Sequence, residues 1–140
     1  MTPAKETTWL MSSMETLPPT LSDKRTLQFC LSFAKRWMLE RHGIPIYEPV
    51  RVVFEEMGER EVDGLYRPGS RLLRIRHGLC SSWGAAAVLH EYIHHCQHED
   101  GSRMTYEAEE RQAYRLMYDY LMEMDTPESR AYAESIKERR

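Results

Sequence analysis

The 140-residue sequence lacks the marks of several protein classes. Its three cysteines, Cys30, Cys80 and Cys96, include no C-x-x-C pair, so they predict neither a disulfide framework nor a thiolate zinc site. No stretch of about 18 apolar residues occurs, which argues against a membrane span. The first residues have no basic start followed by an apolar core, which argues against a secretion signal. We therefore expect a cytoplasmic protein with no membrane partner.

The sequence also lacks a strong charge of either sign. Its formal net charge is −3, which gives no reason to expect a nucleic acid or an anionic membrane as a partner. No internal repeat or low-complexity tract is present. A chain of 140 residues that is 41% hydrophobic has the size and apolar content of one compact domain.

Apolar periodicity and turn residues predict an α+β fold with a short antiparallel sheet. Pro18 and Pro19 end an N-terminal segment, residues 1–20, which we interpret as a flexible arm. The main domain is predicted over residues 21–126, and residues 127–140 form a charged C-terminal tail or a surface helix. Within the domain, the expected elements are a helix over 22–42 capped by Ser22, strands over 50–54, 61–66 and 71–76, a helix over 82–98, and a long helix from Ser102 or Thr105 to about Met124.

The last two strands are expected to form a short antiparallel hairpin. Pro68 and Gly69 stand in the order that a type II turn requires, because proline presets φ at the first central position and glycine tolerates positive φ at the second. Arginines occur along this hairpin and could contact phosphates. Charges on a strand's outer face more often serve solvation and protect the edge, and no recognition helix accompanies them, so nucleic acid is not favoured.

The most informative stretch is an H-E-x-x-H motif formed by His90, Glu91 and His94. It follows a run of small apolar residues in a segment free of proline, where Ser81 or Ser82 can cap the first turn of a helix. Histidines four apart lie on one face of a helix and can bind one metal ion. The glutamate between them can then act as general base toward a metal-activated water.

A catalytic zinc site needs a third protein ligand. Tracing the apolar stripe of the last long helix backwards from Ala113 brings Glu109 or Glu110 onto the inward face, with Glu107 as the fallback. A buried carboxylate is costly unless a cation neutralises it. Acidic residues also favour the first turn of any helix, so these residues alone leave the choice of ligand open.

Glu110 and Ala113 form an E-x-x-A pattern after H-E-x-x-H, and this combination resembles the gluzincin zinc metallopeptidases. The order of hairpin, motif helix and glutamate helix is similar to that of the small ImmA/IrrE-type peptidases and the minigluzincins, over residues 50–124. The resemblance implies a small zincin-like α+β domain, Zn²⁺ bound by His90, His94 and Glu110, and Glu91 as catalytic base. Tyr114 departs from the pattern, since the family often has aspartate or asparagine there.

Other zinc patterns fit less well. Metzincins would place a ligand at Asp100, but Gln97 stands where that motif needs a glycine to turn the chain. His98 reaches a metal only if the helix bends, and His95 is expected at the surface or behind the ligands. Tyr106, Tyr114 and His77 are unranked candidates for stabilising the transition state.

The expected function is therefore zinc-dependent hydrolysis of peptide bonds in a peptide or protein substrate. In this hypothesis the strand over 71–76 pairs with an extended substrate whose acidic side chains suit the hairpin arginines. The first alternative is a non-catalytic, zinc-stabilised interaction module with a closed four-ligand site. The second is a nucleic-acid-associated protein that uses those arginines. Oligomeric state does not follow from the sequence.

Overall fold

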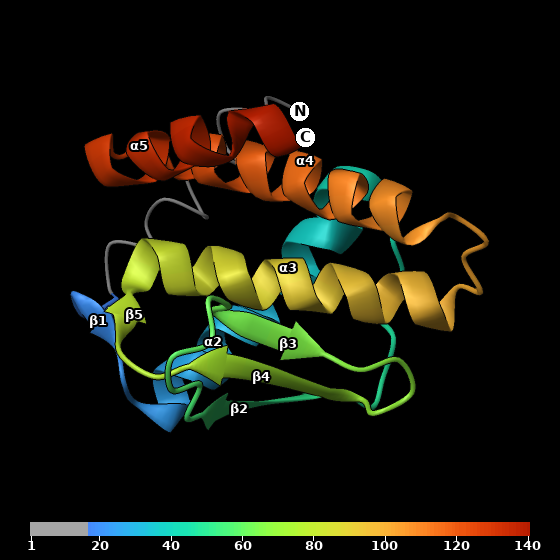
Figure 1. Ribbon diagram of the computed structural model, residues 1–140, viewed down its shortest axis with the longest axis horizontal. Coiled ribbons are helices and arrows are strands. Elements are labelled where there is room, and N and C mark those ends of the chain that lie inside the picture. The colour runs from blue at the N-terminus through green and yellow to red at the C-terminus, as the bar shows by residue number, and fades with distance from the viewer. Residues whose placement is uncertain (1–16) are drawn as a thin grey trace.

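A computed structural model describes residues 17–140 and confirms the α+β class. The part of the predicted arm before residue 17 lies outside this range. Figure 1 shows α3 lying between a three-stranded sheet and α4, with α5 beyond α4. The elements in chain order are β1 (Thr20–Leu21), α2 (Lys24–His42), β2 (Arg51–Glu55), β3 (Gly64–Tyr66), β4 (Leu72–Arg76), β5 (Leu79–Cys80), α3 (Ser81–Glu99), α4 (Tyr106–Met124), α5 (Pro127–Ile136) and the 3₁₀ turn η1 (Lys137–Arg139).

The main sheet has the strand order β2-β4-β3 and is mixed. The predicted hairpin is confirmed: β3 and β4 are antiparallel, Ser70 N–H donates to the Arg67 carbonyl at 3.0 Å, and Gly69 has a φ of +84°. The expectation of a wholly antiparallel sheet was wrong, because β2 pairs in parallel with β4. The chain reverses between β2 and β3, and β4 then returns between them. This order leaves β3 at one edge.

Helix α2 packs against α3 and β2 and buries Leu31, Ala34 and Trp37. Its cap is Asp23, whose carboxylate accepts from the Arg25 N–H, so the prediction of Ser22 as cap was wrong. Either residue type can accept this bond, and residue identity alone does not fix the helix start to one position. The helix ends at His42 as predicted, and Gly43 follows it with a φ of +65°.

Helix α3 is buried over most of its circumference, which explains its run of small residues. It begins at Ser81 with Cys80 in the cap position and no side-chain cap, so the predicted capping by Ser81 or Ser82 was wrong. The Ser81 N–H instead donates to the Pro19 carbonyl at 3.0 Å. Gly84 is needed for close packing, because a Cβ there would lie 2.6 Å from Leu21 Cδ2.

Of the two predicted starts of helix α4, Ser102 and Thr105, the second is the one observed: Thr105 caps the helix, and its hydroxyl accepts from the Ala108 N–H at 3.1 Å. The C-terminal segment forms α5, which packs on α4 and buries Ala133 and Ile136. Residues 137–139 continue as η1 along α4. Among the described helices, none is both long enough and apolar enough to cross a membrane.

Candidate metal centre

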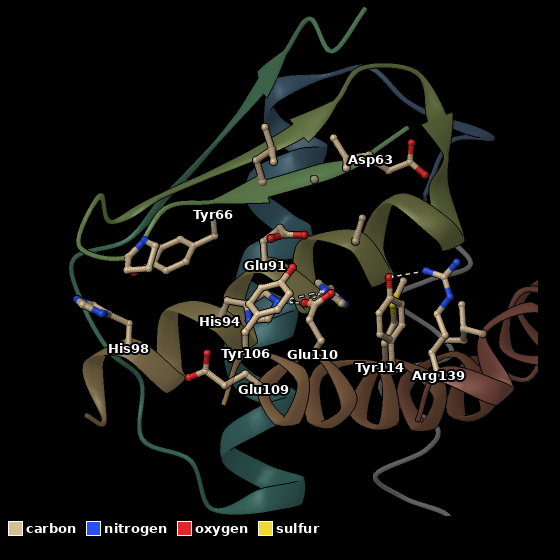
Figure 2. A pocket seen from close by; sticks show the side chains of 18 of the residues that line it. Asp63, Tyr66, Glu91, His94, His98, Tyr106, Glu109, Glu110, Tyr114 and Arg139 are labelled. Atoms are coloured by element: carbon tan, nitrogen blue, oxygen red, sulfur yellow. Dashed lines mark hydrogen bonds and ion pairs between the residues drawn. The ribbon is translucent and has the colours of Figure 1, made fainter. Parts of the chain in front are cut away.

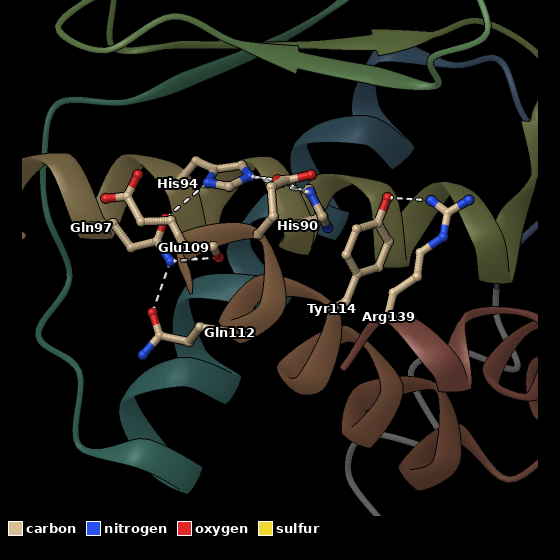
Figure 3. Close-up of polar contacts among 8 residues, drawn as sticks. His90, His94, Gln97, Glu109, Gln112, Tyr114 and Arg139 are labelled. Atoms are coloured by element: carbon tan, nitrogen blue, oxygen red, sulfur yellow. Dashed lines mark hydrogen bonds and ion pairs between the residues drawn. The ribbon is translucent and has the colours of Figure 1, made fainter. Parts of the chain in front are cut away.

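The two histidines of the motif face each other from α3. Their Nε2 atoms are 3.2 Å apart, and both rings are largely buried, with His90 8% exposed as a residue and the His94 side chain 16% exposed. Figure 3 shows both rings directed toward the start of α4. The spacing of four residues therefore places both rings on one face of α3, as the sequence predicted.

Glu110 of α4 joins the two histidines. Its Oε1 lies 3.2 Å from His90 Nε2 and 2.5 Å from His94 Nε2. The potential ligand atoms of these three residues all lie within 4.8 Å of one another, and no other such group of three or more occurs among residues 17–140. Glu107 and Glu109, the two alternatives left open by the sequence, are not part of this group. Glu107 lies about one helical turn before Glu110, and its carboxylate therefore does not reach the two histidines.

Two of the three separations between the donor atoms fit a metal ion. Two ligands that lie about 2.0–2.1 Å from one zinc at the tetrahedral angle are about 3.3 Å apart. The His90–His94 and His90–Glu110 separations are both 3.2 Å, whereas His94 and Glu110 are at the hydrogen-bond distance of 2.5 Å and would have to move apart to bind one ion. Two imidazole nitrogens cannot approach this closely with both lone pairs directed at each other unless a proton or a cation lies between them. The chemistry and the geometry of the set suit a divalent cation.

Gln97 fixes the orientation of His94 (Figure 3). The Gln97 side-chain amide donates from Nε2 to the Glu109 carbonyl at 3.1 Å and to Gln112 Oε1 at 2.8 Å. This arrangement directs Gln97 Oε1 toward His94 Nδ1 at 2.8 Å, where it accepts the ring N–H. In the neutral ring the lone pair is then on Nε2, the atom that faces Glu110 and His90, as a metal ligand requires. Without a metal, Nε2 has to carry a proton to donate to Glu110 Oε1 at 2.5 Å.

The electrostatics of the group favour positive charge between the donors. Hydrogen bonds from His90 and His94 hold the pKa of the Glu110 carboxyl well below its usual range. Burial alone would lower the pKa of His94, but the hydrogen bond to Glu110 and the charge of Glu91 raise it overall. Two carboxylates around two imidazoles can be neutralised by protons or by a metal cation.

Glu91 is buried beside this group, and burial raises its pKa. Its side chain lies directly against Gly64 of β3: a Cβ on Gly64 would be 2.8 Å from both Glu91 Cγ and Glu91 Oε2. Glycine at position 64 therefore provides the space that the carboxylate occupies. A raised pKa brings a carboxyl closer to the range in which it exchanges protons at neutral pH.

Two contacts hold β3 along α3. Gly64 lies against Glu91, and the Tyr66 hydroxyl donates to His95 Nδ1 at 3.0 Å. Four residues of helix advance about 6 Å and two residues of strand about 6.6 Å, so the two contacts match in spacing. His95 is fully buried and its Nε2 donates to the Tyr47 carbonyl at 3.1 Å. Of the two positions expected for His95, at the surface or behind the ligands, the surface position was therefore wrong.

The remaining candidates lie outside the ligand group. Asp100 accepts a hydrogen bond from the Tyr47 hydroxyl at 3.0 Å, and His77 packs its ring on Phe54. His98 lines the same cleft as the ligand group but does not join it, since α3 remains helical through Glu99. The described residues thus offer three ligands and no fourth.

The ligand group opens into a cleft of about 950 Å³ between β3 and the start of α4, shown in Figure 2. Tyr106 stands at its rim with 75% exposure, and the Tyr114 ring packs edge-on to His90 with centroids 4.7 Å apart. The Tyr114 hydroxyl accepts from Arg139 of η1 at 2.8 Å. The C-terminal segment therefore contributes to the wall of the cleft.

Three site residues were missed by reasoning from the sequence: Gln97, Gly64 and Arg139. Gln97 lies three residues after His94, a spacing that predicts contact on a helix. From the sequence, Gln97 was interpreted only as standing where the metzincin motif has a glycine. Gly64 carries no signal, because its role depends on how a strand packs against a helix far along the chain. Arg139 lies in the charged segment over residues 127–140, which was predicted to be a tail or a surface helix.

No protein-family model matches this chain, and neither the curated proteins nor the solved structures contain a match.

Proposed function

We propose that the protein is a zinc-dependent metallopeptidase of gluzincin type, with His90, His94 and Glu110 as ligands and Glu91 as general base. The observation that carries the proposal is the convergence of two imidazole nitrogens and one carboxylate oxygen within 4.8 Å of one another, with two of the three closest separations at the 3.2 Å that suits a tetrahedral zinc ion. A bound zinc ion would supply Lewis acidity and a water whose pKa falls from about 15.7 to about 7.

Glu91 would take up the proton lost by the attacking water and deliver it to the leaving amine. Its burial supports this role, because burial raises the pKa of the carboxyl and so brings it nearer to neutral pH. Its position also supports the role, because it follows His90 directly and its carboxylate borders the cleft. On the β3 side, Glu91 lies against Gly64, which has no side chain to displace the carboxylate.

An extended peptide would bind along β3. The hypothesis that the strand over 71–76 receives the substrate has to be changed, since β4 is the central strand and pairs on both sides. Within residues 17–140, β3 pairs only with β4 and so lies at an edge of the sheet, and its residues line the cleft. Main-chain hydrogen bonds to such an edge hold a substrate extended without requiring a particular sequence.

The hairpin arginines do not contribute to substrate binding in this proposal. Arg76 pairs with Asp63 at 3.1 Å and Arg74 lies 3.4 Å from Glu55, so their charges are already compensated. None of the hairpin arginines lines the cleft; these are Arg60, Arg67, Arg71, Arg74 and Arg76. The pairing of Arg74 and Arg76 also weakens the support for a nucleic-acid partner.

Tyr114 is the best-placed group to stabilise negative charge on the substrate oxygen. Its ring packs against His90, and its hydroxyl lies at the wall of the cleft. His77 does not line the cleft, and Tyr106 is mostly exposed at the rim. A closed, purely structural zinc site would need a fourth protein ligand, and among the described residues only three converge, which favours an open catalytic site.

The test compares Glu91→Gln with His94→Ala. We expect Glu91→Gln to bind one zinc ion per chain and to lose peptide hydrolysis by a factor of at least about 100, the lower end of what general-base catalysis contributes. His94→Ala should lose both zinc and hydrolysis. Zinc content is measured by atomic emission and hydrolysis by mass spectrometry of peptide mixtures. Hydrolysis by a metal-free preparation, or full activity in Glu91→Gln, would contradict the proposal.

A further inference from the structure

The charged side chains that line the cleft are strongly unequal in sign. Apart from Glu91 and Glu110, three further acids border it, and the only permanent cation among the described lining residues is Arg139. The acids are Glu61, Asp63 and Glu109, of which Asp63 is paired with Arg76 behind the cleft wall and the other two have no such partner among residues 17–140. A single guanidinium in an acidic cleft is a discriminating feature, because apart from the proposed metal ion it is the one lining group with which a negatively charged substrate group gains rather than loses Coulomb energy.

Arg139 is held in place but not neutralised. Its Nη1 donates to the Tyr114 hydroxyl at 2.8 Å, and its Cζ lies 5.1 Å from the Tyr114 ring centroid. Other arginines of the described chain, such as Arg41, Arg76 and Arg130, face a carboxylate. Within residues 17–140, Arg139 has no carboxylate at ion-pair distance. A guanidinium presents five N–H donors in a planar fork, so most of them remain available for another acceptor.

The distance from Arg139 to the ligand group determines how many substrate residues can lie between them. The Tyr114 ring links it to His90, with 4.7 Å between the two ring centroids and 5.1 Å from the Tyr114 centroid to Arg139 Cζ. The guanidinium carbon therefore lies within about 10 Å of the His90 ring. An extended peptide advances about 3.3 Å per residue, so this distance spans no more than about three residues.

We propose that Arg139, oriented by Tyr114, binds a carboxylate of the peptide substrate that lies within three residues of the bond to be cleaved. This proposal rests on the proposed peptidase function and specifies the substrate class for the same site. The carboxylate can be the C-terminus of the substrate or the side chain of an aspartate or glutamate. A planar guanidinium binds either through two parallel N–H···O bonds.

The first experiment maps cleavage. The zinc-loaded protein is incubated with decapeptides randomised at every position, with free-acid or amidated C-termini, and the products are sequenced by mass spectrometry. Recognition of the C-terminus predicts that fragments of one to three residues are released from free-acid peptides only. Recognition of a side chain predicts cuts within three residues of aspartate or glutamate in both sets. Cuts unrelated to any carboxylate would overturn the proposal.

The second experiment measures binding without turnover. Zinc-loaded Glu91→Gln protein is titrated calorimetrically with the preferred peptide and with its amide counterpart, which lacks that one carboxylate. We expect about tenfold tighter binding of the acid, a modest value for a charge-assisted hydrogen bond at a partly exposed site. Adding Arg139→Gln should abolish the difference, whereas Arg139→Lys should retain part of it. A difference that persists in Arg139→Gln would overturn the proposal.

The controls separate binding from structure and from the proposed reaction. Arg140 lies beside Arg139 but stacks on Tyr118 outside the cleft, so Arg140→Gln should keep both the preference and the zinc affinity. Loss of the preference in Arg140→Gln would instead indicate a general effect of η1 and would count against Arg139. If the wild-type protein cleaves no peptide but Glu91→Gln still prefers the acid of any one acid–amide pair, the peptidase proposal fails and the carboxylate site stands.

Discussion

Replacing Gly64 by alanine tests whether the packing of β3 on α3 positions the general base. The added Cβ would lie 2.8 Å from Glu91 Cγ and Oε2, whereas carbon atoms in contact prefer about 3.5–4.0 Å. Glu91 therefore has to move by roughly 0.7–1.2 Å, or β3 has to move away from α3 by a similar amount. The obstructing atoms belong to the end of a flexible side chain, so we expect the carboxylate to move and the fold to persist.

The expected magnitudes differ between stability and rate. Rotating one side chain away from its preferred position costs about 0.5–1.5 kcal/mol, which most domains tolerate. A displacement of about 1 Å at a catalytic group can cost on the order of 100-fold in rate, equivalent to about 2.7 kcal/mol of transition-state stabilisation. Gly64→Ala should therefore reduce kcat/KM far more than it reduces the free energy of unfolding. The three atoms nearest to the added Cβ all belong to Glu91 and none to a proposed ligand, so zinc affinity should be preserved.

The assay measures kcat/KM, zinc affinity and urea unfolding on the same preparations. A double-mutant cycle provides the control: the unfolding cost of Gly64→Ala should largely vanish in Glu91→Ala, where the side chain that it displaces is gone. Unchanged kcat/KM in a folded, zinc-loaded Gly64→Ala protein would refute the reasoning. An equal unfolding cost in both backgrounds would show that the alanine clashes with something other than Glu91.

Two further predictions concern the ligand group. Glu110→Gln should weaken zinc binding by at least about 100-fold, which exceeds the usual effect of residues that only orient ligands, while Glu107→Gln should leave zinc binding unchanged. Competition with a chromogenic chelator measures both affinities. An equal loss in the two variants would remove Glu110 from the ligand set. Gln97→Ala should weaken zinc binding by about 10–100-fold, because His94 loses the acceptor that fixes its Nδ1–H tautomer. Wild-type affinity in Gln97→Ala would show that this hydrogen bond does not orient the ring.

The parts of the site that depend on one helix could be predicted from the sequence. His90 and His94 are four residues apart, and helical geometry alone places them on one face. The acid from α4 was harder to assign, because Glu107 and Glu110 share a face and Glu109 is adjacent to it. Only the register between α3 and α4 distinguishes them, and that register depends on packing along both helices.

The parts that depend on contacts between distant segments could not be predicted. β2 was expected in an antiparallel sheet, but it pairs in parallel with β4, which returns between β2 and β3. The direction of pairing could not be predicted because the residue pattern of a strand does not encode it. Arg139 was assigned to a surface tail because its local sequence is charged. Its place in the cleft follows from the burial of Ala133 and Ile136, which fixes α5 on α4 and directs η1 along the same helix toward Tyr114.

The shortness of β3 limits how tightly a substrate can be held in the ground state. Three residues at a sheet edge offer at most about four outward main-chain hydrogen bonds, because alternate residues point theirs back toward β4. Each contributes on the order of 1 kcal/mol net. Most of any larger interaction would have to arise at the reacting bond itself. Activity screens should accordingly use millimolar peptide, since low micromolar concentrations would leave the protein mostly unsaturated and its turnover easy to overlook.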